Sequence, residues 1–128
     1  MLWRKWWIRR REAVAMSPSS RQQAEARRIT KEIAKVGFVL PGSLCERRLA
    51  CTHTGCHCHD DPPQLHGPYW YWTRKVRAKT VSRMLSAEQV AEYRPWIENE
   101  RRLRALVREL EQLGLQIVED DPRTPHRR

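Results

Sequence analysis

The chain has 128 residues, with 25 lysines and arginines against 15 aspartates and glutamates, a net charge of +10 and a pI of about 10.2. No stretch approaches the roughly 18–20 apolar residues of a membrane-spanning helix, and so short a chain does not suit an enzyme with a large substrate pocket. The aromatic, leucine and valine content of the second half disfavours full disorder, which leaves a small basic domain whose default partner is a polyanion, most often nucleic acid.

The excess positive charge lies in the N-terminal two thirds of the chain. Residues 1–40 carry ten basic and three acidic side chains, and residues 41–86 carry seven and three. Residues 87–128 carry eight basic and nine acidic side chains, a balance typical of a solvated amphipathic helix.

Residues 1–15 form an extension rich in tryptophan and arginine. Basic side chains interrupt the apolar run that a secretory signal needs, so we expect a cytoplasmic protein. Two interpretations stay open: an arm that adheres to a membrane surface or to nucleic acid, and a mis-assigned start with the natural one at Met16. We therefore expect a single α+β domain over 16–114 and a polar tail over 115–128.

The first expected element is an amphipathic helix over residues 21–36. Ser19 or Ser20 is a candidate N-cap, and Gly37 is suited to the position after the last turn. Apolar side chains recur at steps of three and four and form one stripe: Ala26, Ile29, Ile33 and Val36.

Three strands are expected next, in one small antiparallel sheet. Residues 44–50 predict an exposed strand, residues 69–76 a strong strand and residues 79–85 a third. The link Arg77-Ala78 is short enough for a hairpin, although it lacks glycine and asparagine.

A long helix is expected to follow a capping box over residues 86–89. We expect Pro95 to break or kink this helix and Gly114 to end it. Its apolar stripe is predicted to pack onto the sheet, with dimerisation as the alternative: Trp96, Asn99, Leu103, Leu106, Leu110 and Leu113.

Residues 51–66 have no apolar periodicity but hold three cysteines and four histidines. Such a segment cannot fold by burying carbon, whereas three thiolates and one imidazole form a tetrahedral set for structural Zn²⁺. We predict one zinc ion per chain, held in a zinc-knuckle-like loop by Cys51, Cys56, Cys58 and His66. His53, His57 and His59 compete for the fourth position, as does Cys45, which falls on the preceding strand.

Other uses of the cysteines are less consistent with the sequence. Disulfides are disfavoured because the chain shows no export signal, while unliganded loop cysteines remain an alternative. A Cys3His set has no open position for a substrate, so we expect no catalytic residues and no small-molecule substrate.

These motifs resemble an uncharacterised prokaryotic family, a domain of unknown function often found near mobile elements. The resemblance covers roughly residues 20–113 and rests on five segments: Leu40–Ser43, Glu46–Arg48, the Cys51-x4-Cys56-x-Cys58 triplet, His66–Tyr71 and Lys79-Thr80. The family usually has an aliphatic residue at Cys45, which implies that this thiol is not a ligand. It often has glycine where this chain has Arg77-Ala78.

The predicted function is non-enzymatic binding of nucleic acid, DNA in preference to RNA. Basic side chains on or near the predicted sheet would contact phosphates, and aromatic ones would stack on unpaired bases. The predicted contacts are Arg47, Arg48, Arg74, Lys75, Arg77, Lys79 and Arg83. The alternative is a protein–protein adaptor or accessory subunit that forms a homodimer, or docks a larger protein, through its C-terminal helix.

Overall fold

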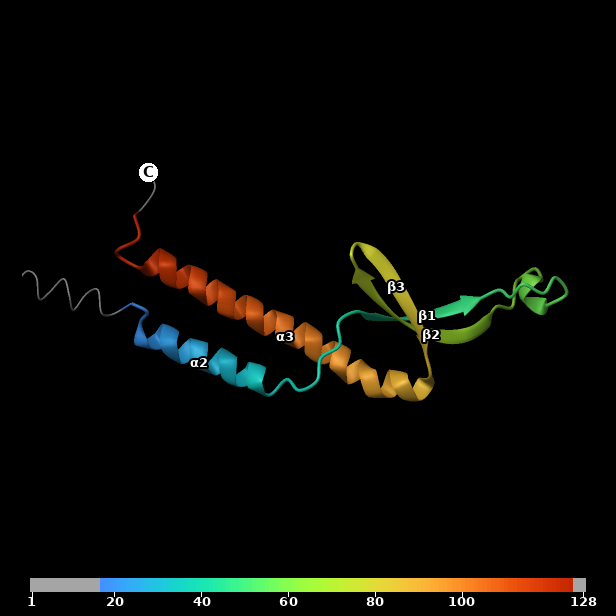
Figure 1. The fold of residues 1–128 in the computed structure, drawn as a ribbon, viewed down its shortest axis with the longest axis horizontal. Helices are drawn as coiled ribbons and strands as arrows, with labels where there is room; N and C mark the ends of the chain where they lie inside the picture. Colours follow the sequence, from blue (N-terminus) through green and yellow to red (C-terminus); the bar gives the residue numbers. More distant parts are fainter. Residues whose placement is uncertain (1–16, 126–128) are drawn as a thin grey trace, which may run out of the picture. The chain divides into compact units, whose positions relative to one another are not determined.

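The structure is a computed structural model that describes residues 17–125; the expectations for residues 1–15 and for a start at Met16 lie outside this range. Its elements, in chain order, are α2 (Ser20–Ala34), β1 (Ser43–Leu49), the short 3-10 helix η1 (His57–His59), β2 (His66–Val76), β3 (Lys79–Leu85) and α3 (Ala87–Asp120) (Figure 1). The predicted α+β class is confirmed, with a three-stranded antiparallel sheet and a Cys/His loop between the two helices.

The described residues fall into two compact units. The helical unit comprises α2, up to Val36, and the part of α3 from Arg102 onwards. The sheet unit comprises Gly37–Arg101, which includes the three strands, the Cys/His loop and the first turns of α3. None of the described helices is both long and apolar enough to cross a membrane.

The helical unit is held together by the stripe that the sequence predicts on α2. Ser19 and Gln22 form a capping box at its start, with the Gln22 N–H donating to Ser19 Oγ over 3.2 Å. Ile29 and Val36 are buried together with Leu106 of α3. Partly buried side chains surround this cluster: Ile33, Leu103, Leu110 and Leu113. The expectation that the leucine stripe packs onto the sheet is therefore wrong, because its partner is the apolar stripe of α2.

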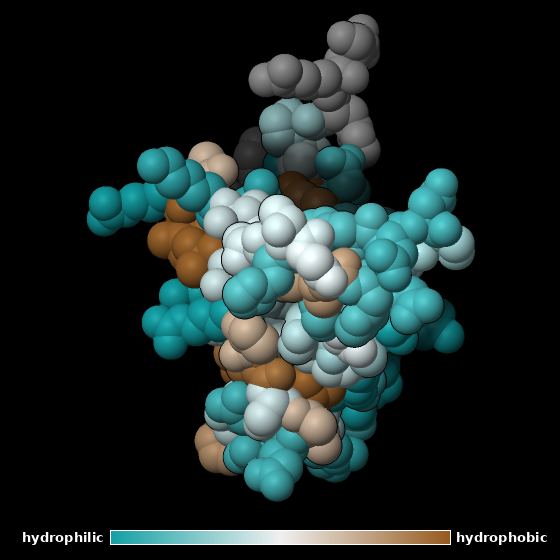
Figure 2. Space-filling model, turned by 90° about the vertical axis from the view of Figure 1, so that its right-hand side faces the viewer, coloured by the Kyte–Doolittle hydropathy of each residue, from teal (hydrophilic) through white to brown (hydrophobic). Residues whose placement is uncertain are grey.

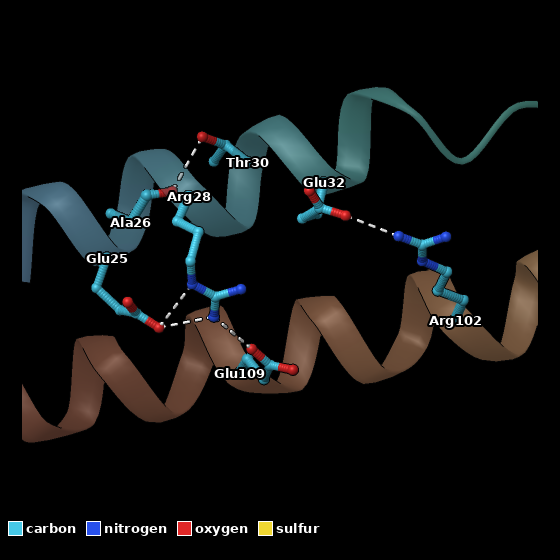
Figure 3. Close-up of polar contacts among 7 residues, drawn as sticks. All are labelled: Glu25, Ala26, Arg28, Thr30, Glu32, Arg102 and Glu109. Carbon is cyan, nitrogen blue, oxygen red and sulfur yellow. Dashed lines mark hydrogen bonds and ion pairs between the residues drawn. The ribbon is translucent and has the colours of Figure 1, made fainter.

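Ion pairs flank this apolar contact (Figure 3). The Arg28 guanidinium lies 2.7 Å from Glu25 on its own helix and 3.1 Å from Glu109 on α3. Arg102 pairs with Glu32 over 2.7 Å in the same way. In this unit, therefore, several basic side chains are neutralised by carboxylates.

Helix α3 is one continuous element from Ala87 to Asp120, so the predicted break at Pro95 and the predicted end at Gly114 are wrong. Both residues are exposed. The apolar pattern of Leu110 and Leu113 continues past Gly114 to the half-buried Ile117, which gives the last turns a reason to stay helical.

In the sheet unit the strand order is β1-β2-β3, with both neighbouring pairs antiparallel. The predicted hairpin at Arg77-Ala78 is confirmed, and both residues have positive φ, at 48° and 66°. This is the backbone of the two-residue turn that matches the twist of paired strands, adopted here without the usual glycine or asparagine.

The register divides the sheet into two faces. We call one the tyrosine face, because Tyr69 and Tyr71 of β2 point to it, and the other the tryptophan face, because Trp70 and Trp72 point there. On the tryptophan face the Arg94 guanidinium of α3 lies 5.1 Å from the Trp70 ring centre. Within this unit, Arg94 in the first turns of α3 therefore lies over the tryptophan face.

Candidate metal centre

The pairing of β1 with β2 brings together the two ends of the Cys/His loop. Leu49 pairs with His66, so Cys51 follows β1 directly beside the start of β2. Cys56 caps the short 3-10 helix that contains Cys58. Four residues separated by up to 15 positions in sequence thereby converge at one end of the sheet.

A β-bulge decides where the His66 imidazole points. The pairing shifts between Arg47 and Leu49, so that β2 has one extra residue opposite β1. Gly67 takes a φ of +122° at this point, and a Cβ there would lie 2.9 Å from the Arg47 carbonyl oxygen. Simple alternation would place His66 with the tryptophans, but its pairing with Leu49 places it on the tyrosine face.

The four predicted ligands lie together in the structure. Their donor atoms are all within 4.8 Å of one another, with Cys51 Sγ 3.5 Å from Cys58 Sγ and Cys56 Sγ 3.3 Å from His66 Nε2. A tetrahedral ion with bonds of about 2.3 Å to sulfur and about 2.0 Å to nitrogen separates its sulfurs by about 3.8 Å and sulfur from nitrogen by about 3.5 Å. The observed distances fit a metal bound by these four side chains.

The other histidines of the loop have different contacts. His59 Nε2 lies 2.8 Å from the Cys51 carbonyl oxygen, a contact that ties the 3-10 helix to the start of the loop. His53 accepts the Cys56 N–H through its carbonyl oxygen at 3.2 Å, and the His57 carbonyl accepts the N–H groups of Asp60 and Gln64. Within the described part of the chain, none of them belongs to the four-residue cluster.

Cys45 is also separate from the cluster. It lies on β1 opposite Tyr71, and its Sγ is 4.0 Å from Thr73 Oγ1. This position agrees with the inference, drawn from the resemblance, that the Cys45 thiol is not a ligand.

The environments of the cysteines shift two thiol pKa values in opposite directions. A hydrogen bond with the Cys58 backbone is the main cause that lowers the pKa of Cys56 to about 6. Burial raises the pKa of Cys58, which is only 2% exposed. Metal binding would therefore displace the proton that burial retains on Cys58, because a coordinating thiol must be ionised.

The loop has little hydrophobic burial of its own. Between Cys51 and His66 only Cys58 is buried. Figure 2 looks at the side of the molecule that this loop occupies in Figure 1, and the surface there is mostly white and teal with small brown areas. Coordination is thus the interaction with enough free energy to order this segment.

The seven predicted nucleic-acid contacts are exposed and are divided between the two faces of the sheet. Arg47 and Lys75 belong to the tyrosine face, whereas Arg74, Lys79 and Arg83 belong to the tryptophan face. Arg77 lies in the hairpin turn, and Arg48 lies opposite the bulge.

Within the described residues none of these seven side chains is ion-paired with a carboxylate. Two lie over aromatic rings instead, Arg47 at 5.0 Å from the Tyr71 centre and Arg74 at 5.2 Å from that of Trp72.

Sequence reasoning did not identify the open hollow beside the cluster. Leu49, Tyr69, Tyr71 and Met84 line it together with loop residues. The alternation of strand residues places Tyr69 and Tyr71 on one face, but only the pairing with β1 and β3 adds Leu49 and Met84 to it.

Comparison with protein families matches residues 20–95 to a family described as "Domain of unknown function (DUF6788)". The match spans α2, the whole sheet, the Cys/His loop and the first turns of α3. Curated proteins and solved structures gave no match.

Proposed function

We propose that this chain, which belongs to the DUF6788 family, is a small non-enzymatic protein that is stabilised by one zinc ion and binds nucleic acid, DNA in preference to RNA. The observation that carries the proposal is the set of seven unneutralised basic side chains on the sheet whose end holds the Cys3His cluster.

Zinc is the metal that best suits the donor set. Three soft thiolates and an imidazole in a tetrahedral arrangement favour Zn²⁺ over the hard cations Mg²⁺ and Ca²⁺, which prefer oxygen ligands. Four protein ligands leave no open position for water or substrate, which supports a structural and not a catalytic ion.

The lack of carboxylate partners for the basic side chains of the sheet supports a polyanion as the partner. In the helical unit, Arg28 and Arg102 are held by carboxylates. The sheet unit keeps its seven basic side chains without carboxylate partners in the described residues, at the cost of mutual repulsion, and phosphate groups would relieve that repulsion. A β-ribbon can enter the major groove of DNA, while the narrow major groove of duplex RNA does not admit side chains, and exposed aromatics can stack on unpaired bases.

The test is binding of fluorescein-labelled DNA and RNA to the zinc-loaded full chain, measured by anisotropy over a series of salt concentrations. We expect binding at about 50 mM salt that weakens as the salt rises, because phosphate contacts release counterions. Replacing Arg74, Lys75 and Arg77 by alanine should reduce the slope of log K against log salt by about 2–3.

A matched control removes the same charge from α2, by replacing Arg21, Arg27 and Lys31 with alanine. These three side chains are exposed, and the control should leave the slope nearly unchanged. No binding at low salt would contradict the proposal. An equal loss of slope in both triple variants would also contradict it, since the basic side chains of the sheet would then contribute no more than those of α2.

A protein adaptor remains the second candidate, because α3 exposes apolar side chains near its end. Val107, Leu115 and Val118 are 40%, 61% and 55% exposed, and their spacing places them along one side of the helix. Leu103 and Leu106, on the predicted dimerisation stripe, are instead packed within the helical unit. Sedimentation of wild type and Leu115→Glu over a range of concentrations tests this candidate; assembly that the substitution abolishes would favour it. The mobile-element setting implied by the resemblance stays a prediction.

A further inference from the structure

The tyrosine face holds an open hollow of about 800 Å³ where the sheet meets the Cys/His loop. Strand residues form its floor, among them Tyr69, Tyr71 and Met84. The loop forms its wall through Cys51, Cys56 and neighbouring residues, and His66 lines it too. The metal cluster thereby supports one side of a concave, largely apolar and aromatic surface.

The strands supply no negative charge to this face. The register places on it the hydroxyl side chains Ser43, Thr73, Thr80 and Ser82. Its ionisable side chains besides the tyrosines and Cys45 are His66, Arg47 and Lys75, while Glu46, the acidic residue of the three strands, points to the tryptophan face. The Arg47 guanidinium, 5.0 Å from the centre of the Tyr71 ring that lines the hollow, therefore places a positive charge beside it, which complements a phosphate group.

Tyr69 has the most suitable ring for stacking. It is 36% exposed, and within the described residues no aromatic or cationic group covers its ring. Arg47 pairs across the strands with Tyr69, and its guanidinium lies over the neighbouring ring of Tyr71. This arrangement holds a cation next to a free aromatic surface without covering it.

We propose that the hollow receives an unpaired base of single-stranded DNA, stacked on Tyr69, with Arg47 contacting the adjacent phosphate. This inference rests on the proposed nucleic-acid function and narrows it. A base within a duplex has both of its faces covered by neighbours, so only an unpaired base can use the Tyr69 ring.

The apolar lining favours DNA over RNA and thymine over other bases. Leu49 and Met84, which are 42% and 59% exposed, can contact the methyl group of thymine, which uracil lacks. A ribose 2′-hydroxyl next to these side chains would lose hydrogen bonds to water, and the side chains offer it no hydrogen bond in return.

The test compares fluorescein-labelled dT20, rU20 and a 20-base-pair duplex on the zinc-loaded full chain. We expect dT20 to bind most tightly, with rU20 weaker by about four-fold for the methyl group alone. Tyr69→Ala should weaken dT20 binding by about 5- to 150-fold, the range for one stacked base, whereas Tyr69→Phe should keep wild-type affinity because it retains the ring.

A second pair of variants keeps the test independent of folding defects at Tyr69. Met84→Glu adds a carboxylate on the tyrosine face, and Val81→Glu adds the same charge on the tryptophan face at a side chain that is also exposed. We expect Met84→Glu to weaken dT20 binding clearly more than Val81→Glu. Metal content and circular dichroism check that each variant is folded.

The outcomes separate this inference from the function on which it rests. Duplex binding that equals or exceeds dT20 binding and is unchanged by Tyr69→Ala would overturn the base-stacking site and leave the nucleic-acid function standing. Tighter binding of rU20 than of dT20 would overturn the assignment to DNA. No binding of any probe at low salt would overturn both.

Discussion

Replacing Cys58 by serine should remove the metal and unfold the Cys/His loop. The Cys58 thiol is 2% exposed, lies 3.5 Å from Cys51 Sγ and accepts the Cys51 N–H at 3.4 Å. A serine hydroxyl at this place is a harder and weaker ligand for zinc, and it does not ionise near neutral pH. Because the site is enclosed here, we expect no water molecule to take over the fourth position.

The size of the effect follows from the number of ligands. Structural zinc contributes about 10–16 kcal/mol to the folding of small zinc modules, which corresponds to about 2.5–4 kcal/mol for each of four ligands. The loss of one ligand should therefore weaken zinc binding by about 10²–10³-fold. The loop buries no other side chain to offset this loss, so its order should be lost with the metal.

The assay is competition with a chromophoric chelator, together with the zinc content of freshly purified, reduced protein. Cys45→Ser is the matched control, because Cys45 lies on β1 beside Thr73 and away from the cluster. We expect one zinc ion per chain in wild type and in Cys45→Ser, and substoichiometric zinc in Cys58→Ser. Equal zinc affinity in the two serine variants would refute the ligand set, and wild-type protein without metal would refute the site.

Three further substitutions test the backbone and the electrostatics. Gly42→Ala should destabilise the sheet by about 2–4 kcal/mol in urea unfolding, because Gly42 has a φ of +117° and a Cβ would collide with the Thr73 carbonyl oxygen; an unchanged midpoint would contradict this. Ala78→Gly should stabilise the hairpin by about 0.5–1 kcal/mol, since glycine relieves a φ of 66°, and a lower midpoint would count against the turn geometry. A hydrogen bond from Arg28 lowers the pKa of Glu25 below its usual value. The Glu25 carboxylate therefore adds to the free energy of unfolding at neutral pH, and this contribution is lost as the pH falls through the lowered pKa. Glu25→Gln should thus lower the urea midpoint at pH 7, and the difference from wild type should shrink as the pH falls through the lowered pKa of Glu25; a constant difference would show that proton linkage is not its cause.

Local patterns predict most of the elements because they depend on neighbouring residues. The capping residues and the three-and-four spacing of Ile29 and Ile33 predict α2, and the β-forming run from Tyr69 predicts β2. The same local rules fail for α3. They count Pro95 and Gly114 as helix breakers, but the apolar stripe extends on both sides of Gly114, and tertiary packing outweighs the local preference.

The partner of each apolar surface could not be predicted in the same way. A stripe of leucines must be buried against another apolar surface. In the sequence, both the sheet and α2 offer such a surface. Only the structure shows Leu106 buried with Ile29 and Val36. Burial is non-directional, so the sequence pattern alone does not distinguish one apolar partner from another.

The sequence by itself determined the four ligand types, their order along the chain and the absence of an apolar alternative in residues 51–66. Tertiary structure decided which histidine joins the cysteines and which side of the sheet they share. A single extra residue in β2, at Gly67, turns His66 to the tyrosine face and brings the cluster beside the exposed ring of Tyr69. The physical reason is the two-residue period of a strand: a shift of one residue moves a side chain to the opposite face, and only the pairing with β1 sets that shift.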